Sequence, residues 1–144
     1  MVSFTVTYKN ISKILISKVS LAACGSKLNN EKLHIALWDT GATGSVITQK
    51  VINELNLIPV SCINVSTPQG TYEANCYFVD ISLTDEAIIP NLYVVHGEPT
   101  GCDILIGMDI INRGDFAVSN FNDKTQFTFR MPSVEDIDFK KINK

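Results

Sequence analysis

The sequence predicts a single, mainly antiparallel all-β domain with little helix. Short runs of β-branched and aromatic residues recur along the chain and are separated by turn residues, which is the pattern of an all-β fold. The 144 residues are enough to bury one ordinary core, and 45% of them are hydrophobic while the net charge is only −3. These values are typical of a globular protein.

Alternating residue patterns locate the strands. We expect them at Phe4–Tyr8, Lys13–Leu21, Leu33–Trp38, Ser61–Ser66, Thr71–Leu83, Ile88–Val95, Asp103–Ile106, Phe116–Ser119 and Gln126–Arg130. A first short helix is expected over Thr48–Leu57, with Thr48 at its amino-terminal cap. A second is expected over about Met108–Arg113, with Gly114 in the left-handed conformation that often follows a helix.

Turn residues then define the organisation of the domain. The stretches Ser66–Gly70 and Phe121–Thr125 are expected to close two hairpins. We predict one domain over residues 1–131, with an N-terminal strand extension at 1–30 and a long hairpin at 61–83. The tail, residues 132–144, is expected to be a solvated extension or an edge strand.

Composition excludes several classes of partner. The twelve Lys and Arg residues are scattered, so we expect no nucleic-acid partner. No apolar run approaches the roughly 20 residues that cross a bilayer, so we expect no membrane partner. The ending LAAC, Leu21–Cys24, resembles a lipoprotein cleavage box, but Lys18 interrupts the apolar core that such a signal needs. We therefore interpret it as strand and expect a cytoplasmic location.

The four cysteines fit no metal-ligand spacing, so we expect neither a metal nor another cofactor. Cys62 and Cys76 flank the predicted turn near Gln69, so a disulfide between them is geometrically feasible. Reduced, small buried side chains are the favoured interpretation. The two histidines are expected to be structural or solvated, because His34 lies on the face of its strand opposite Asp39 and His96 lies in a loop.

The stretch ALWDTGATGSVIT, Ala36–Thr48, contains the main candidate functional residue, Asp39. Strand alternation places Leu37 and Asp39 on one face and Trp38 on the other, so a carboxylate follows apolar residues on its own face. A buried carboxylate needs hydrogen bonds, a partner or a function. A turn over Thr40 and Gly41 would supply backbone donors, and taken alone this pattern is equally consistent with an Asx-turn.

Further motifs separate the alternatives. ALWDTGATGSVIT resembles the active-site loop of retropepsin-type aspartic proteases, and ILIGMDII, Ile104–Ile111, resembles the second motif of that family. A hairpin at Ser61–Leu83 lies between them, where the family has its flap. The order and spacing agree from Leu33 to Arg130, and the chain is closest in character to bacterial retropepsin-like proteins.

The resemblance implies a fold, an activity and a site. The fold is the retropepsin-like acid protease fold with one lobe per chain, and the activity is that of an aspartic endopeptidase. Asp39 is the implied catalytic residue, supported in its loop by Thr40, Gly41 and Ala42. The implied substrate-binding residues are Thr43, the flap-tip residues Thr67, Pro68, Gln69 and Gly70, and the pocket residue Leu105.

The chemistry requires two aspartates, and the chain carries one Asp-Thr-Gly. We therefore expect a homodimer that contributes Asp39 twice and binds an extended peptide. Viral enzymes carry an acidic residue and an arginine where this chain has Thr43 and Met108, so another dimer contact must replace that pair. Residues 1–30 and the strand Gln126–Arg130 are the candidates.

Two other hypotheses stay open at this stage. The chain is alternatively a catalytically silent retropepsin-fold module for dimerisation or peptide binding, because fold does not imply function. It is otherwise an unrelated β domain in which the aspartate merely caps a turn.

Overall fold

The computed structural model describes residues 1–142, so the last two residues of the predicted tail lie outside it. The strands are β1 (Val2–Thr7), β2 (Ile16–Ala23), β3 (His34–Trp38), β4 (Val46–Ile47), β5 (Ser61–Thr67), β6 (Gly70–Ser82), β7 (Ile88–His96), β8 (Ile104–Ile106), β9 (Asp115–Ser119) and β10 (Gln126–Met131). The helices are α1 (Gln49–Glu54), α2 (Met108–Ile111), α3 (Phe139–Ile142) and the 3₁₀ turn η1 (Phe121–Asp123).

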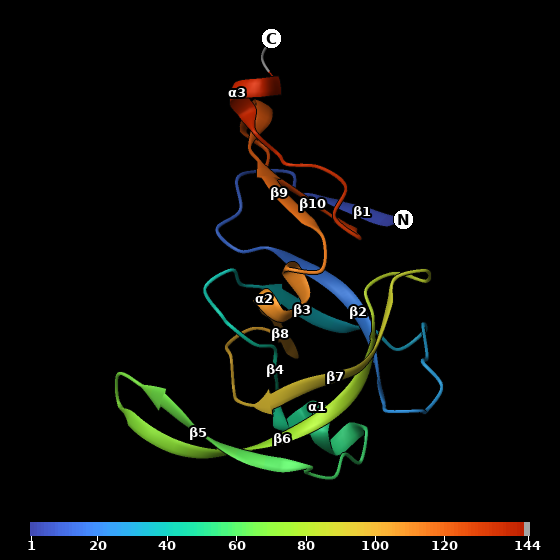
Figure 1. Cartoon of the computed structure of the whole chain (residues 1–144), viewed down its shortest axis with the longest axis vertical. Helices are drawn as coiled ribbons and strands as arrows, with labels where there is room; N and C mark the ends of the chain where they lie inside the picture. The colour runs from blue at the N-terminus through green and yellow to red at the C-terminus, as the bar shows by residue number, and fades with distance from the viewer. Residues whose placement is uncertain (143–144) are drawn as a thin grey trace.

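The strands form two sheets (Figure 1). The larger has the order β2-β3-β8-β4-β7-β6-β5, and because β2 also pairs with β6, its first six strands close into a ring. The smaller sheet has the order β1-β10-β9. The hairpin of β5 and β6 extends beyond the ring on the same side as the loop that follows β3. The mainly antiparallel all-β class is therefore confirmed.

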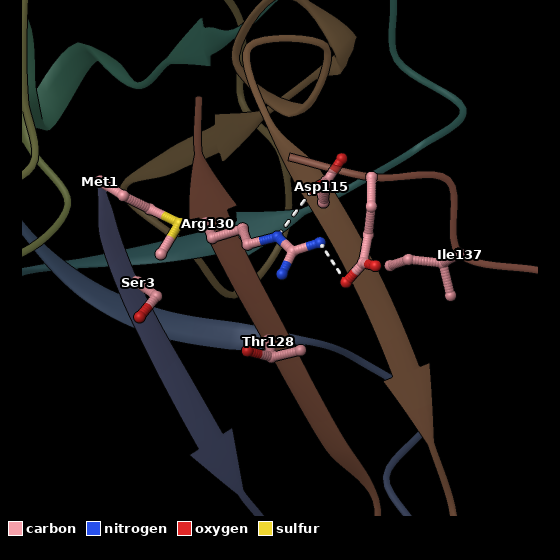
Figure 2. A pocket seen from close by; sticks show the side chains of 7 residues that line it. Met1, Ser3, Asp115, Thr128, Arg130 and Ile137 are labelled. Carbon is pink, nitrogen blue, oxygen red and sulfur yellow. Dashed lines mark hydrogen bonds and ion pairs between the residues drawn. The ribbon is translucent and has the colours of Figure 1, made fainter. Parts of the chain in front are cut away.

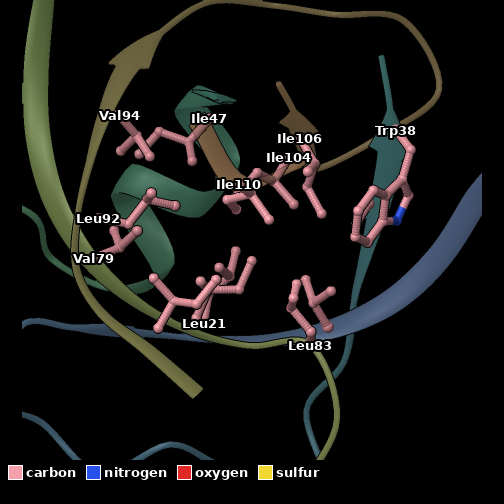
Figure 3. Close-up of a cluster of buried hydrophobic side chains, with 14 of the residues drawn as sticks. Leu21, Trp38, Ile47, Val79, Leu83, Leu92, Val94, Ile104, Ile106 and Ile110 are labelled. Carbon is pink, nitrogen blue, oxygen red and sulfur yellow. The ribbon is translucent and has the colours of Figure 1, made fainter. Parts of the chain in front are cut away.

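The core fills the ring and continues between the two sheets. Aliphatic side chains such as Val79, Ile104 and Ile110 are fully buried inside the ring (Figure 3). Trp38 lies at the junction, stacked on Phe116 at 5.5 Å between ring centroids and tilted against Phe129 at 5.2 Å. Aromatic pairs of this kind contribute about 0.5–1.5 kcal/mol each beyond the area they bury. The small sheet is thereby fixed to the strand that ends at Asp39.

Most predicted elements occur with shifted ends. The first three residues of LAAC complete β2, which runs from Ile16 to Ala23 and not from Lys13 to Leu21, and Cys24 lies in the turn that follows. Thr48 is the residue before α1, but its hydroxyl donates to the carbonyl oxygen of Asp103 and does not cap the helix. Gly114 is not left-handed, and it lies so close to the Arg130 backbone that a Cβ would collide with it.

The structure also bears on the cysteines, the tail and the histidine of β3. Cys62 and Cys76 are free, which agrees with the favoured interpretation as reduced side chains. Cys62 lies opposite Asn75 in the hairpin, and because neighbouring residues of a strand point to opposite faces, the two thiols do not face one another. The tail ends in the short helix α3 and not in an edge strand. His34 is buried and its Nε2 lies 2.9 Å from Glu54, so it is structural. No helix among residues 1–142 is both long enough and apolar enough to span a membrane.

Candidate active site

Two parallel strands bring the two sequence motifs together. β3 and β8 pair in parallel, with Trp38 opposite Ile106. Parallel neighbours end at the same edge of a sheet, so the loop from Asp39 and the loop from Gly107 begin side by side. A main-chain hydrogen bond of 2.9 Å from the Asp39 N–H to the Ile106 carbonyl fixes this junction.

Asp39 stands in a tight turn that leaves its carboxylate half-exposed. The Gly41 N–H donates to Asp39 Oδ1 at 2.8 Å, and the Ala42 N–H donates to the Asp39 carbonyl at 3.2 Å. The predicted alternation of β3 is correct, but the face that carries Asp39 is more exposed than expected. Trp38 and its face are buried, whereas Ile35 on the Asp39 face is 42% exposed. In a single chain, Asp39 therefore faces outward.

Gly107 allows the two loops to touch. The Met108 N–H donates to the Ala42 carbonyl at 2.8 Å. A Cβ at position 107 would lie 2.7 Å from the Gly44 carbonyl oxygen and 2.8 Å from that of Ala42, which is closer than carbon approaches oxygen in proteins. Only glycine therefore fits between β8 and the Asp39 loop.

A buried clamp joins the same loops. Ser45 is fully buried, its hydroxyl donates to Asp109 Oδ1 at 2.7 Å, and its N–H donates to Oδ2 at 2.9 Å. The Gly107 N–H in turn donates to the Ser45 oxygen at 3.2 Å. Local sequence patterns do not identify Asp109 as a member of this clamp. The spacing of Ser45 six residues after Asp39 was the available signal, but it did not identify the partner.

The hairpin tip is a two-residue turn over Pro68 and Gln69. Thr67 ends β5 and Gly70 begins β6, and the Thr67 hydroxyl donates to the Gly70 carbonyl at 2.9 Å. Gly70 has a φ of 133°, which other residues rarely adopt. Although the tip is distant from Asp39 in the sequence, it lies on the same side of the molecule as the Asp39 loop (Figure 1).

Leu105 belongs to an apolar row beside Asp39. It lies opposite Leu37 of β3 on one side and Val46 of β4 on the other, and Val46 lies opposite Val95 of β7. Residues opposite one another share a face of the sheet, so this row extends from the Asp39 face across four strands. We call this surface the cleft face. Val46 was missed because its two-residue strand has no period to detect, and Val95 was missed because its place in the row depends on the pairing of β7 with β4.

A cavity of about 380 Å³ joins Asp39 and Thr40 to the small sheet. Phe116 and Val118 of β9 line it, together with residues 13–15. Local sequence patterns do not indicate that Phe116, Val118 and residues 13–15 line a cavity with Asp39, because the pairing of distant strands creates it. Thr43 is exposed and lines no part of it.

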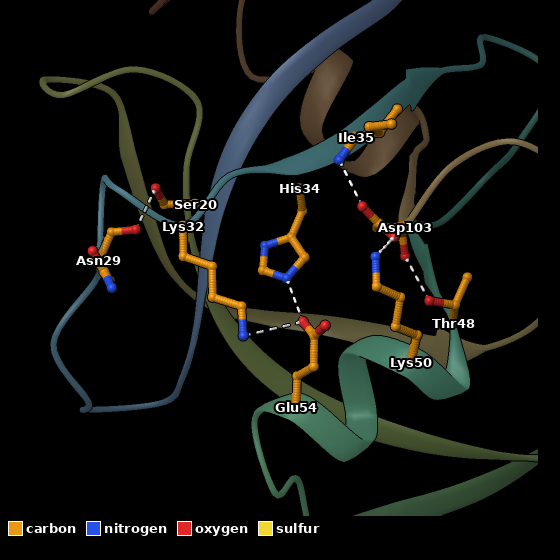
Figure 4. A network of polar contacts seen from close by, with 9 residues as sticks. All are labelled: Ser20, Asn29, Lys32, His34, Ile35, Thr48, Lys50, Glu54 and Asp103. Carbon is orange, nitrogen blue, oxygen red and sulfur yellow. Dashed lines mark hydrogen bonds and ion pairs between the residues drawn. The ribbon is translucent and has the colours of Figure 1, made fainter.

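A polar network supports the loop from the other end of β3 (Figure 4). Asp103 Oδ2 accepts the Ile35 N–H at 2.8 Å, and its Oδ1 accepts the Lys50 ammonium at 2.9 Å. Glu54 is contacted by His34 and by Lys32. The hydrogen bond from His34, assisted by Lys32, holds the pKa of Glu54 below its ordinary value. These contacts tie α1 and β8 to the strand that delivers Asp39.

A second cavity, of about 330 Å³, lies on the polar face of the small sheet (Figure 2). Asp115 accepts hydrogen bonds there from Ser133, Val134 and Arg130. This cluster fastens the tail to the sheet on the side away from the aromatic residues, so it is separate from the site at Asp39.

The fold and the Asp-Thr-Gly loop, closed against the Gly107 motif, define a retropepsin-like aspartic protease. The chain belongs to the family described as gag-polyprotein putative aspartyl protease, whose model matches residues 24–113. No curated protein matches the chain.

Solved structures support the fold. A retropepsin-like aspartic protease from Rickettsia conorii superposes with a TM-score of 0.56 at 12% identity, covering 90% of this chain and 94% of its own. EIAV protease, complexed with the inhibitor HBY-793, superposes with a TM-score of 0.51 at 24% identity, covering 74% of this chain and 91% of its own.

Proposed function

We propose that the protein is a homodimeric aspartic endopeptidase whose catalytic dyad is Asp39 from each of two subunits. The observation that carries this proposal is the half-exposed Asp39 carboxylate, held by the Gly41 N–H in a loop that the Ser45–Asp109 clamp fixes. The chain has one such loop, and the chemistry needs two carboxylates.

The mechanism follows from the pairing of like charges. Two carboxylates in contact share one proton, because both cannot ionise cheaply. The ionised member removes a proton from a water held between them, and the protonated member donates to the scissile carbonyl oxygen. The water attacks the carbonyl carbon and forms a tetrahedral intermediate. The Asp39 that took the proton of the water then donates it to the peptide nitrogen, the C–N bond breaks and the amine leaves, while the other Asp39 takes a proton from the intermediate. Thr40 and Gly41 keep both carboxylates in position.

The exposed edge of β9 supports a second copy at this site. In residues 1–142, β9 pairs only with β10, and an unpaired strand edge is a template for another strand. Phe116 and Val118 of β9 line the cavity that contains Asp39. In Figure 1, β9 forms the edge of its sheet on the side where the Asp39 loop and the hairpin also lie. A two-fold axis there would pair β9 with β9 and Asp39 with Asp39.

This contact refines the expectation about the dimer. The N-terminal strand β1 and the strand β10 pair with one another in the same chain, with Phe4 opposite Phe129. β10 is therefore the central strand and β1 the other edge of the small sheet. Because β9 lines the cavity that contains Asp39 and β1 does not, we assign the contact between subunits to β9.

The proposed substrate is an extended peptide. The hairpin of β5 and β6 would close over it as the flap, with Thr67, Pro68, Gln69 and Gly70 at the mobile tip. Main-chain hydrogen bonds would hold the peptide as an added strand, and Leu105 would form a pocket wall for an apolar side chain. Ala42 and Thr43 would border the peptide.

Cleavage of an unbiased peptide library by the wild type and by Asp39→Asn tests the proposal. We expect cleavage by the wild type only, with a statine-type inhibitor abolishing it. Sedimentation velocity on the same samples should give a dimer. Cleavage by both proteins would assign the activity to another group. A dimer that binds peptides but never cleaves them would favour a silent peptide-binding module.

A further inference from the structure

Two aromatic side chains lie exposed next to the apolar row of the cleft face. Phe78 on β6 and Tyr93 on β7 are each 41% exposed. Their rings form an edge-on pair with centroids 5.5 Å apart. An exposed aromatic pair on a strand surface is costly to solvate and marks a surface for contact.

Strand register places this pair on the cleft face. Val95, the end of the apolar row, lies opposite Cys76, and Tyr93 lies opposite Phe78. Each aromatic residue is two positions from its neighbour in the row, and alternate residues of a strand share a face. The register irregularity of β6 comes later, between Val79 and Ile81, so it does not disturb this relation.

A hydrogen bond orients the tyrosine. Its hydroxyl lies 2.7 Å from the Ser61 oxygen on β5. Ser61 lies opposite Cys76, so the Tyr93 side chain reaches across β6 and contributes to the complete burial of Cys76. The ring is therefore a fixed platform and not a freely rotating side chain.

The β5–β6 hairpin has one mainly apolar face and one polar face. The face continuous with the row carries Ile63, Val65, Tyr72 and Ala74, all without charge. The opposite face is polar and consists of Cys62, Asn64, Ser66, Thr71, Glu73 and Asn75. Apart from Ser61 and Thr67, which share this face, the side chains are apolar or aromatic from Leu105 to the aromatic pair and along the hairpin.

We propose that Phe78 and Tyr93 form an outer subsite that selects a bulky apolar or aromatic side chain of an extended peptide. Residues of one face repeat about every 6.6 Å along a strand, and so do alternate side chains of an extended peptide. Consider a peptide that runs alongside β7 with one apolar side chain against Val46 and Val95. Its side chain two residues further along then lies over Phe78 and Tyr93. The inference rests on the proposed function for its substrate class.

Matched peptides test the subsite directly. Each fluorescein-labelled peptide has a fixed centre of four leucines in serine flanks, with one flanking serine at a time replaced by phenylalanine. We expect one flanking position at which phenylalanine raises kcat/KM with the wild type, and affinity for Asp39→Asn, by about tenfold. A difference below twofold at every position would overturn the inference while leaving the endopeptidase intact.

Variants identify the residues responsible. Phe78→Thr and Tyr93→Thr keep the strand propensity and should abolish the preference for phenylalanine. Phe121→Thr, at an 81% exposed aromatic residue of the β9–β10 connection, should retain it. A preference for phenylalanine that persists in both Phe78→Thr and Tyr93→Thr would overturn the assignment. If either variant fails to fold, the peptide comparison with the wild type still decides whether the subsite exists. Discrimination by Asp39→Asn without any wild-type cleavage would support the subsite and overturn the proposed enzyme.

Discussion

At the scale of single residues, the position of Asp39 depends on further contacts besides the Gly41 N–H that binds its carboxylate. Ser45 and Gly107 lie behind the loop, and each joins it to the α2 segment. A catalytic dyad needs both carboxylates held to within a fraction of an ångström, because misplacement of a reacting group costs rate steeply. Substitution of the residues behind the loop should therefore leave a folded protein with reduced activity.

Asp109→Ala should leave the Ser45 hydroxyl and N–H unpaired in a buried place. We expect the free energy of unfolding to fall by about 1–3 kcal/mol and kcat to fall more than KM rises. Urea unfolding and peptide cleavage measure the two effects. Asp85→Ala, at an exposed turn, is the control and should change neither. Unchanged kcat in a folded Asp109→Ala protein would remove the clamp from the catalytic argument.

Gly107→Ala should force a Cβ against the carbonyl oxygens of Ala42 and Gly44. We expect a loss of about 1–3 kcal/mol, because the backbone on both sides must move. Gly44→Ala is a matched control in the same loop, since a Cβ there would meet nothing within 4 Å. It should change stability by less than about 0.5 kcal/mol. Equal melting temperatures for the two variants would contradict the packing argument.

At the scale of elements, periodic strands were predictable and pairings were not. The runs that became β5, β6 and β7 alternate long enough to be recognised, whereas β4 has two residues and owes its existence to neighbours on both sides. The Asp39 motif was visible because its residue types are specific. The clamp partner Asp109 and the row residue Val95 depend on long-range register, which local patterns do not contain.

The link between the small sheet and the tail predicts a pH dependence. The hydroxyl of Ser133, then the Val134 N–H and the Arg130 guanidinium, hold the pKa of Asp115 well below its ordinary value. Folding therefore favours the ionised form, and this stabilisation is present above the ordinary carboxyl pKa of about 4 and is lost as the pH falls below it.

The variant Asp115→Asn measures this contribution. The wild type should be more stable than the variant at pH 7, and the difference in urea midpoint should shrink as the pH falls below about 4. Asp138→Asn is the control, because Asp138 is more exposed and its ion-pair partner Lys141 lies 3.9 Å away. A difference between wild type and Asp115→Asn that is the same at pH 3 and pH 7 would contradict the assignment.

At the scale of the whole molecule, the proposed homodimer would bring together two copies of one surface. The half-exposed Asp39, the unpaired edge of β9 and the cavity between them lie on one side. Val118 is 40% exposed in the single chain and would become buried if β9 paired with β9. A charge at this position is therefore tolerated by a monomer and costly in the dimer.

Val118→Asp should for this reason give a folded monomer without peptidase activity. Far-UV circular dichroism should match the wild type, while sedimentation velocity should show half the mass and cleavage should be lost, because the second Asp39 is missing. Phe121→Asp places the same charge only three residues away at an 81% exposed position and should stay dimeric and active. A Val118→Asp protein that still sediments as a dimer would move the subunit contact away from β9, and activity in a strict monomer would remove the need for the dyad itself.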